Sequence, residues 1–122
     1  MKVRLILLIP LVAGCAAPPT AAPQQASELT GRAAGAPQRC VPIRATDSLR
    51  ISENDRHTLV YGSGRTVWAN PLGSCGFGVN DVPITEPMGS SYCRGDIVRS
   101  FDRYSRIPGP SCVLGDFVPY TR

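Results

Sequence analysis

The chain has 122 residues and a formal net charge of +4, so it has room for one modest domain. Much of the positive charge lies near the N-terminus. From Cys40 onward, nine arginines stand against eight aspartates and glutamates, which leaves a balance of only +1. A balance this close to neutral lacks the basic surface typical of nucleic-acid-binding domains, and we expect no nucleic-acid partner.

The first fourteen residues have the layout of a secretory signal. Lys2 and Arg4 give a positive start, residues 5–12 (LILLIPLV) form an apolar core, and Ala13-Gly14 supplies small residues before a cysteine. The apolar run is well short of the roughly 20 residues that a membrane-spanning helix needs. The pattern therefore predicts a signal peptide over residues 1–14.

The tetrapeptide Val12-Ala13-Gly14-Cys15 resembles the lipobox of bacterial lipoproteins. In that class the cysteine thiol takes a diacylglyceryl group, the signal is cut before the cysteine, and the new amino terminus is usually acylated. The resemblance implies a stable membrane anchor at Cys15, because several acyl chains hold where a single chain is marginal. The alternative is an ordinary secretory signal with a cysteine near its end.

The residue after Cys15 bears on the membrane that the protein occupies. In enteric lipoproteins an aspartate at this position favours retention in the inner membrane, whereas this chain has Ala16. By that analogy we expect an outer-membrane lipoprotein on the periplasmic face. Residues 15–39 are rich in Ala, Pro, Gln and Gly and contain no aromatic residue, which predicts a disordered tether ahead of a domain at 40–122.

The cysteine count agrees with this organisation. With Cys15 assigned to lipid, an even set of four remains: Cys40, Cys75, Cys93 and Cys112. In a small exported domain such a set indicates two disulfides, with three possible pairings. Joining neighbouring strand candidates favours Cys40–Cys75 with Cys93–Cys112. Zinc is disfavoured because its ligands usually come in close pairs, while these spacings are 35, 18 and 19 residues, and we expect no metal or cofactor.

Strand patterns dominate the domain. Residues 57–61 and 65–70 are rich in β-branched and aromatic residues and flank Gly62-Ser63-Gly64, which predicts a hairpin. A Ser63-Gly64 turn would place Leu59 opposite Trp68, and a Gly62-Ser63 turn would slip the register. Further strand candidates are 96–101, 112–118 and short segments near Ile43 and Ile51. We predict an all-β fold, a small open sheet or compact barrel of about five or six strands, with Tyr61, Trp68 and Tyr120 packed in its core.

A set of spaced residues in this domain resembles a family of short, uncharacterised lipoproteins and secreted proteins of Gram-negative bacteria. The pattern is Cys40-x-x-Ile43, Leu72-x-x-Cys75, Cys93-x-Gly95-Asp96 and Cys112-x-Leu114-Gly115-x-Phe117. The resemblance implies a Gram-negative envelope setting and no particular activity.

Catalytic patterns are weak. His57 is the only histidine, and no nucleophile turn accompanies it. The polar run 52–55 lacks the spacing and the glycine of a calcium loop. We therefore predict no enzyme activity. A minor envelope hydrolase, the alternative, would need carboxylates such as Asp47, Asp55 and Asp81 to converge in a cleft.

The most basic stretch of the domain contains Arg94, Arg99, Arg103 and Arg106. Arginine binds carboxylates and phosphates with two parallel hydrogen bonds, so these residues are the candidate contacts for an envelope protein, an anionic polymer or lipid headgroups. Our main hypothesis is a non-enzymatic binding or structural module. A second hypothesis is a small inhibitor of an envelope hydrolase that uses the loop Met88–Ser91 or Ser105–Pro110.

Overall fold

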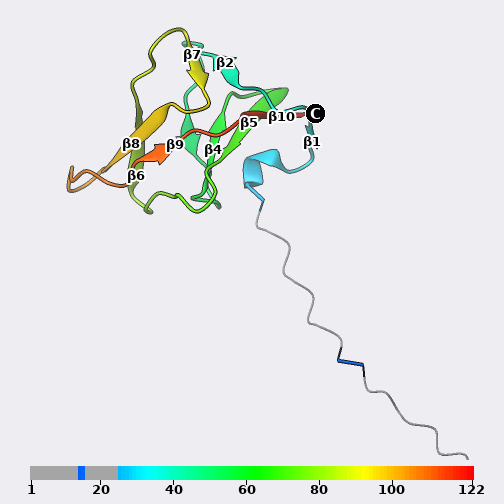
Figure 1. The fold of residues 1–122 in the computed structure, drawn as a ribbon, viewed down its shortest axis with the longest axis horizontal. Helices are drawn as coiled ribbons and strands as arrows, with labels where there is room; N and C mark the ends of the chain where they lie inside the picture. The colour runs from blue at the N-terminus through cyan, green and yellow to red at the C-terminus, as the bar shows by residue number, and fades with distance from the viewer. Residues whose placement is uncertain (1–13, 16–24) are drawn as a thin grey trace, which may run out of the picture.

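The computed structural model describes residues 14–15 and 25–122, so residues 1–13 of the predicted signal peptide and residues 16–24 of the predicted tether lie outside it. As predicted, the fold is all-β, and its strands form open sheets of five, two and three strands (Figure 1). A compact barrel, the other predicted form, is wrong for the described residues. There are ten short strands where five or six were expected, because several contain only two or three residues.

The strands have the following bounds and order. The five-stranded sheet runs β1 (Ala33–Ala34), β10 (Val118–Thr121), β5 (Thr66–Pro71), β4 (Thr58–Tyr61) and β3 (Arg50–Ile51). The three-stranded sheet runs β6 (Asp81–Thr85), β8 (Ile97–Asp102) and β9 (Cys112–Val113), and β2 (Cys40–Pro42) pairs with β7 (Ser91–Cys93). A single 3-10 turn, η1 (Ser27–Leu29), precedes them. No helix among the described residues is long and apolar enough to cross a bilayer.

The predicted hairpin is present as β4 and β5, but both predicted registers are wrong. Leu59 lies opposite Asn70 rather than Trp68, and Trp68 lies opposite Tyr61. The loop between the strands contains both glycines. Gly62 and Gly64 have φ values of 86° and 81°, a backbone region that glycine adopts without steric cost. The pair nearest the turn is Tyr61 with Trp68, so residues 62–67 lie between the last paired positions of the hairpin.

The predicted strand at 112–118 is two strands in different sheets. β9 ends at Val113 in the three-stranded sheet, and β10 begins at Val118 in the five-stranded sheet. Between them, the side chain of buried Asn70 bonds to the backbone of Gly115: its amide donates to the Gly115 carbonyl at 2.9 Å and its carbonyl accepts the Gly115 N–H at 2.8 Å. A side chain thus satisfies the backbone where the chain changes sheets.

Aromatic residues lie in the core, as predicted. Tyr61 is 1% exposed, and its ring packs against Trp68 and edge-on against Tyr92. The Tyr61 hydroxyl donates to the Pro42 carbonyl at 2.9 Å and accepts the Arg44 N–H at 2.8 Å, so the polar end of the ring is satisfied inside the fold. Tyr120 is half-buried against a second, smaller apolar cluster.

The prediction of a disordered tether through residue 39 is wrong for its second half. In the N-terminal strap, residues 25–39, Ala26 and Leu29 are buried against Val60, Val67 and Ala69. β1 within the strap pairs with β10 and extends the large sheet by one strand. Composition suggested disorder because the strap has few apolar residues, yet two of them fill the cluster. The domain therefore begins near residue 25, not at Cys40.

The polar run 52–55 holds the strap in place. The Glu28 carboxylate accepts the Ser52 hydroxyl at 2.8 Å and the Glu53 N–H at 3.0 Å. The Asn54 side chain accepts the Ser27 N–H at 2.6 Å and donates to the Gln25 carbonyl at 2.9 Å. The run serves as a docking turn for the preceding chain, a role its sequence did not suggest.

Docking through Glu28 should make stability depend on acid. Burial raises the pKa of the Glu28 carboxyl, but hydrogen bonds from its own backbone, Ser52 and Glu53, with the charge of Arg50, outweigh burial and lower it. A lowered pKa in the folded state gives stability that is present above the ordinary glutamate pKa and is lost as pH falls through the lowered value. We expect Glu28→Gln to lower the urea midpoint at pH 7 and to leave a smaller difference from wild type near pH 3.

The matched control is Glu53→Gln, because Glu53 is an exposed neighbour that contributes only its backbone N–H to this contact. It should leave the midpoint unchanged at both pH values. A Glu28→Gln midpoint equal to that of wild type at pH 7 would contradict the account of the strap.

Candidate functional site

The four domain cysteines form two disulfides, but the predicted pairing is wrong. Cys40 bonds Cys93, and Cys75 bonds Cys112. β2 pairs antiparallel with β7, which puts Cys40 directly opposite Cys93 with their Cα atoms 4.1 Å apart. The predicted pairing assumed that strands near one another in sequence are neighbours in the sheet, and here they are not.

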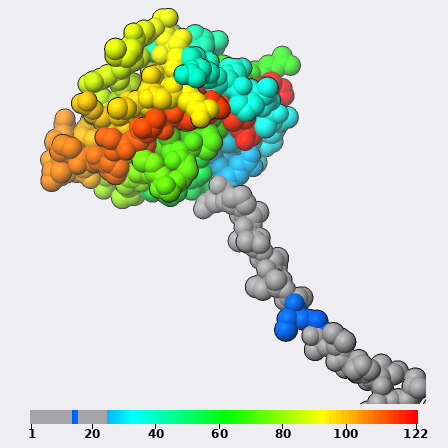
Figure 2. Space-filling model, in the orientation of Figure 1, coloured from blue at the N-terminus to red at the C-terminus, as the bar shows by residue number. Residues whose placement is uncertain are grey.

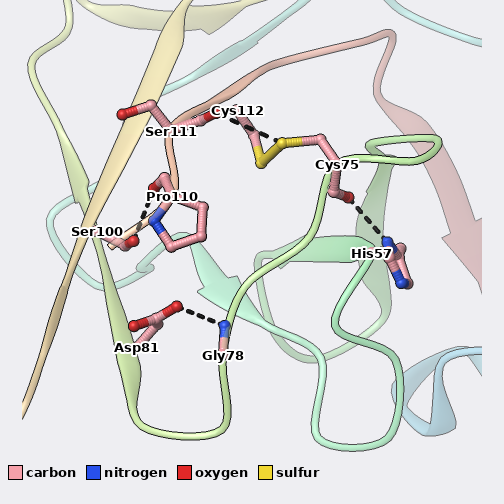
Figure 3. Close-up of a disulfide and its surroundings, with 8 residues drawn as sticks. All are labelled: His57, Cys75, Gly78, Asp81, Ser100, Pro110, Ser111 and Cys112. Atoms are coloured by element: carbon pink, nitrogen blue, oxygen red, sulfur yellow. Dashed lines mark hydrogen bonds between the residues drawn. A yellow bond between two sulfur atoms is a disulfide. The ribbon is translucent and has the colours of Figure 1, made fainter. Parts of the chain in front are cut away.

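The second disulfide fixes the base of the loop between β8 and β9 (Figure 3). Cys112 begins β9 at the end of this loop and is 1% exposed, while Cys75 comes from the connection between β5 and β6. His57 Nδ1 donates to the Cys75 carbonyl at 3.0 Å. The only histidine therefore braces the connection that holds the loop, and its ring is occupied by this backbone contact.

Two further hydrogen bonds join the end of the loop to β8, close to the disulfide. Ser100 Oγ donates to the Pro110 carbonyl at 2.7 Å, and the Gly109 N–H donates to the Ser100 carbonyl at 2.9 Å (Figure 3 draws the first). A Cβ on Gly109 would lie 2.5 Å from Ser100 Oγ and 2.9 Å from Asp81 Oδ1, so glycine is required for this close approach. The two sides of the loop are therefore joined at its base.

The outer part of the loop is a compact turn. The Asp102 carboxylate accepts the N–H groups of Ser105 and Tyr104, both at 2.9 Å, and these two bonds lower the pKa of the Asp102 carboxyl. The Arg106 N–H donates to the Asp102 carbonyl at 2.9 Å, and Arg106 has a positive φ of 61°. Asp102 is therefore engaged in shaping the turn.

Apolar side chains project from this end of the molecule. Tyr104 is 78% exposed and Ile107 is 64% exposed. Val79, in the neighbouring loop before β6, is 71% exposed, and the two loops are joined by the Arg103 N–H bond to the Asn80 carbonyl. We call Val79, Arg103, Tyr104, Arg106 and Ile107 the tip. Figure 2 shows the β8–β9 loop as the orange protrusion at one end of the domain.

The four candidate arginines do not form one cluster. Arg94 lies before β8 and forms an ion pair with Asp116 at 3.3 Å, the one ion pair among residues 25–122. Arg99 lies on the outer face of β8, opposite Ile84 of β6. Arg103 and Arg106 are both exposed on the tip, with the Arg106 guanidinium 5.9 Å from the centre of the Phe101 ring. The structure thus brings together two of the four.

A shallow groove lies beside the three-stranded sheet, and no residue of the tip lines it. Its volume is about 260 Å³, and it is lined by Ile84, Glu86, Met88, Gly95, Asp96, Ile97 and Arg99. The loop Met88–Ser91 forms part of its rim, with Met88 almost fully exposed. The loop is held at its end, where Ser91 pairs with Pro42 and the Ile43 N–H donates to the Ser90 carbonyl. Among residues 25–122, no disulfide closes it on both sides, in contrast to the network at the base of the β8–β9 loop.

The three aspartates proposed for the hydrolase alternative are each occupied in a separate turn. Asp47 accepts the Ser63 hydroxyl, Asp55 accepts the Thr58 hydroxyl at 2.7 Å, and Asp81 accepts the Gly78 N–H. None of them lines the groove, whose carboxylates are Glu86 and Asp96. Within the part of the chain that the structure describes, no group of three His, Cys, Asp or Glu side chains is placed to hold a metal ion.

Comparisons of sequence and fold find no matching protein family, no matching characterised protein and no matching solved structure. Function is therefore inferred from the geometry of the tip and the groove. The sequence identified Arg103 and Arg106, the stretch around them that includes Tyr104, and the candidate loop 105–110 that contains Ile107. It did not identify Val79, and it did not predict that the three apolar side chains are exposed together. The available signal was their position among turn-forming residues, where an apolar side chain has no strand face to occupy.

Proposed function

We propose that this protein is an exported, lipid-anchored binding module without catalytic activity, and that the tip is its binding surface. The observation that carries the proposal is the combination of exposure and bracing in one loop. Tyrosine and arginine are the residue types that dominate binding interfaces, and here they are exposed on a turn whose backbone is already fixed. A preformed turn loses little conformational entropy when it binds, which favours affinity.

The inhibitor hypothesis receives less support from the same loop. A loop that inhibits a peptidase by strand-like pairing in its substrate cleft would present an extended segment. The outer part of this loop is instead a closed turn, with the Arg106 N–H bonded to the Asp102 carbonyl and Arg106 at positive φ. Such a turn suits contact through side chains better than strand-like pairing of its backbone.

The membrane anchor has a direct test. The protein should be isolated from detergent-solubilised membranes of its host and its intact mass measured before and after reduction. We expect a mass for residues 15–122 plus acyl chains, rising by four hydrogens when the two disulfides are reduced. A soluble chain of unacylated mass would refute the anchor.

The binding surface has a separate test by photo-cross-linking in intact cells. A photoreactive amino acid is placed at position 104 and, as a control, at Ser63, an exposed residue of the β4–β5 turn outside the tip. We expect a discrete adduct, protein or lipid, from position 104 and none above background from position 63. Equal labelling from the two positions would refute the tip as a binding surface.

A further inference from the structure

We infer that the tip binds the headgroup region of an anionic lipid bilayer. This inference rests on the proposed function and names the partner of the same surface. It starts from the chemistry of the apolar tip residues: a tyrosine, an isoleucine and a valine, each at least 64% exposed, on two adjoining loops. Three exposed apolar side chains do not stabilise the isolated domain. Their grouping on adjoining loops therefore indicates a contact surface.

The charges at the tip match a lipid surface. Arg103 and Arg106 are exposed, and neither forms an ion pair with another residue of 25–122. The nearest acid in sequence, Asp102, is turned into the loop, where it accepts two backbone N–H groups. Arginine guanidinium groups bind phosphate oxygens with two hydrogen bonds, and each cation near an anionic membrane adds to the attraction.

The shape of the tip also favours lipid over a folded partner. The β8–β9 loop protrudes in Figure 2, so a protein partner would have to offer a matching cavity. A bilayer interface accepts a convex surface in which aliphatic side chains enter the acyl boundary and tyrosine and arginine stay at the headgroups. The tip carries this combination on two adjoining backbones, joined by the Arg103–Asn80 bond.

The position of the tip predicts an orientation. In Figure 1 the β8–β9 loop projects at the left of the domain, away from the start of the strap on its lower side. If the tip contacts the bilayer, the β8–β9 end of the domain faces the membrane. In that orientation the tip provides a second, reversible contact beside the lipid on Cys15.

The test uses the full-length protein reconstituted into vesicles, with a solvent-sensitive fluorescent amino acid at position 104. Vesicles contain either phosphatidylcholine alone or phosphatidylcholine with 30% phosphatidylglycerol, a composition chosen for the experiment at roughly physiological ionic strength. With phosphatidylglycerol present, we expect a blue shift of the probe and quenching by brominated acyl chains. The same probe at Ser63 should show neither.

Variants separate the two parts of the surface. Arg103→Gln with Arg106→Gln should lower the ratio of inserted to free tips by about thirtyfold, given the usual contribution of each cation at an anionic surface. Arg65→Gln with Arg122→Gln removes the same charge from exposed residues outside the tip and should leave the signal unchanged. Ile107→Ser should reduce quenching by the acyl chains.

The outcomes distinguish the two proposals. An unshifted probe on anionic vesicles, or an equal shift on neutral ones, would overturn the lipid inference. A single protein adduct from position 104 in cells would overturn it too, while leaving the tip as a binding surface. Equal cross-linking from positions 104 and 63 would instead remove the proposed function itself.

Discussion

Removing the Cys75–Cys112 disulfide by Cys75→Ala with Cys112→Ala should lower the free energy of unfolding by about 3–4 kcal/mol. The bond closes a span of 37 residues, and its loss returns that entropy to the unfolded chain. Because Cys112 also ends the β8–β9 loop, the amides of the loop should exchange with solvent faster than in wild type. Urea unfolding and hydrogen exchange measure the two effects.

The other disulfide provides the matched control. Cys40→Ala with Cys93→Ala opens a span of 53 residues and should cost a similar amount, about 4 kcal/mol. It joins β2 to β7, away from the tip, so exchange in 103–109 should change only as much as global stability requires. If both pairs of substitutions loosen the loop equally, the disulfide at its base has no local role.

Asn70→Ala should be the most damaging single substitution of a polar residue, at about 2–4 kcal/mol. Asn70 is 0% exposed, and its amide forms both hydrogen bonds to the Gly115 backbone. Alanine leaves the half-buried N–H and carbonyl of Gly115 without these partners and adds a small cavity at the buried position 70. The unfolding midpoint in urea at pH 7 measures the loss.

Asn80→Ala is the control for that substitution. Asn80 is half-buried, and its backbone carbonyl accepts the Arg103 N–H, a bond that alanine keeps. We expect a change within about 0.5 kcal/mol. A cost for Asn70→Ala as small as that of Asn80→Ala would contradict the role of Asn70 in directing the chain from the small sheet to the large one.

The fold class was predictable because its signals are local. Alternating β-branched and aromatic residues around Gly62-Ser63-Gly64 indicate a hairpin, and an even set of cysteines in a small domain predicted to be exported indicates disulfides. The register and the pairing of the cysteines were not predictable, because they depend on which strands meet. Cys40 finds Cys93 through the pairing of β2 with β7, which joins strands 53 residues apart.

The strap escaped prediction for a related reason. Its sequence is poor in apolar residues, so its composition suggests disorder. Ala26 and Leu29 nevertheless pack into a small apolar cluster on the large sheet. Only the folded sheet reveals that cluster. Likewise, the polar run 52–55 has several common uses, and its contact with Glu28 depends on a segment 24 residues earlier.

The tip was half predictable. The density of arginine between Arg94 and Arg106 indicated a binding stretch, but a linear stretch does not show that Arg94 is paired with Asp116 while Arg103 and Arg106 project together. Nor does it show that Val79 joins them, because that neighbour comes from the turn before β6. The exposure of an apolar side chain depends on the fold and cannot be predicted from its local sequence.

Hydrogen exchange of the full-length protein in its native membranes, compared with the same protein in detergent, tests the central claim most directly. We expect slower exchange in membranes at 79–80 and 103–107, where the tip is in contact, and unchanged exchange at 86–90, the exposed loop beside the groove. Protection confined to the groove, or no difference at the tip, would contradict the account.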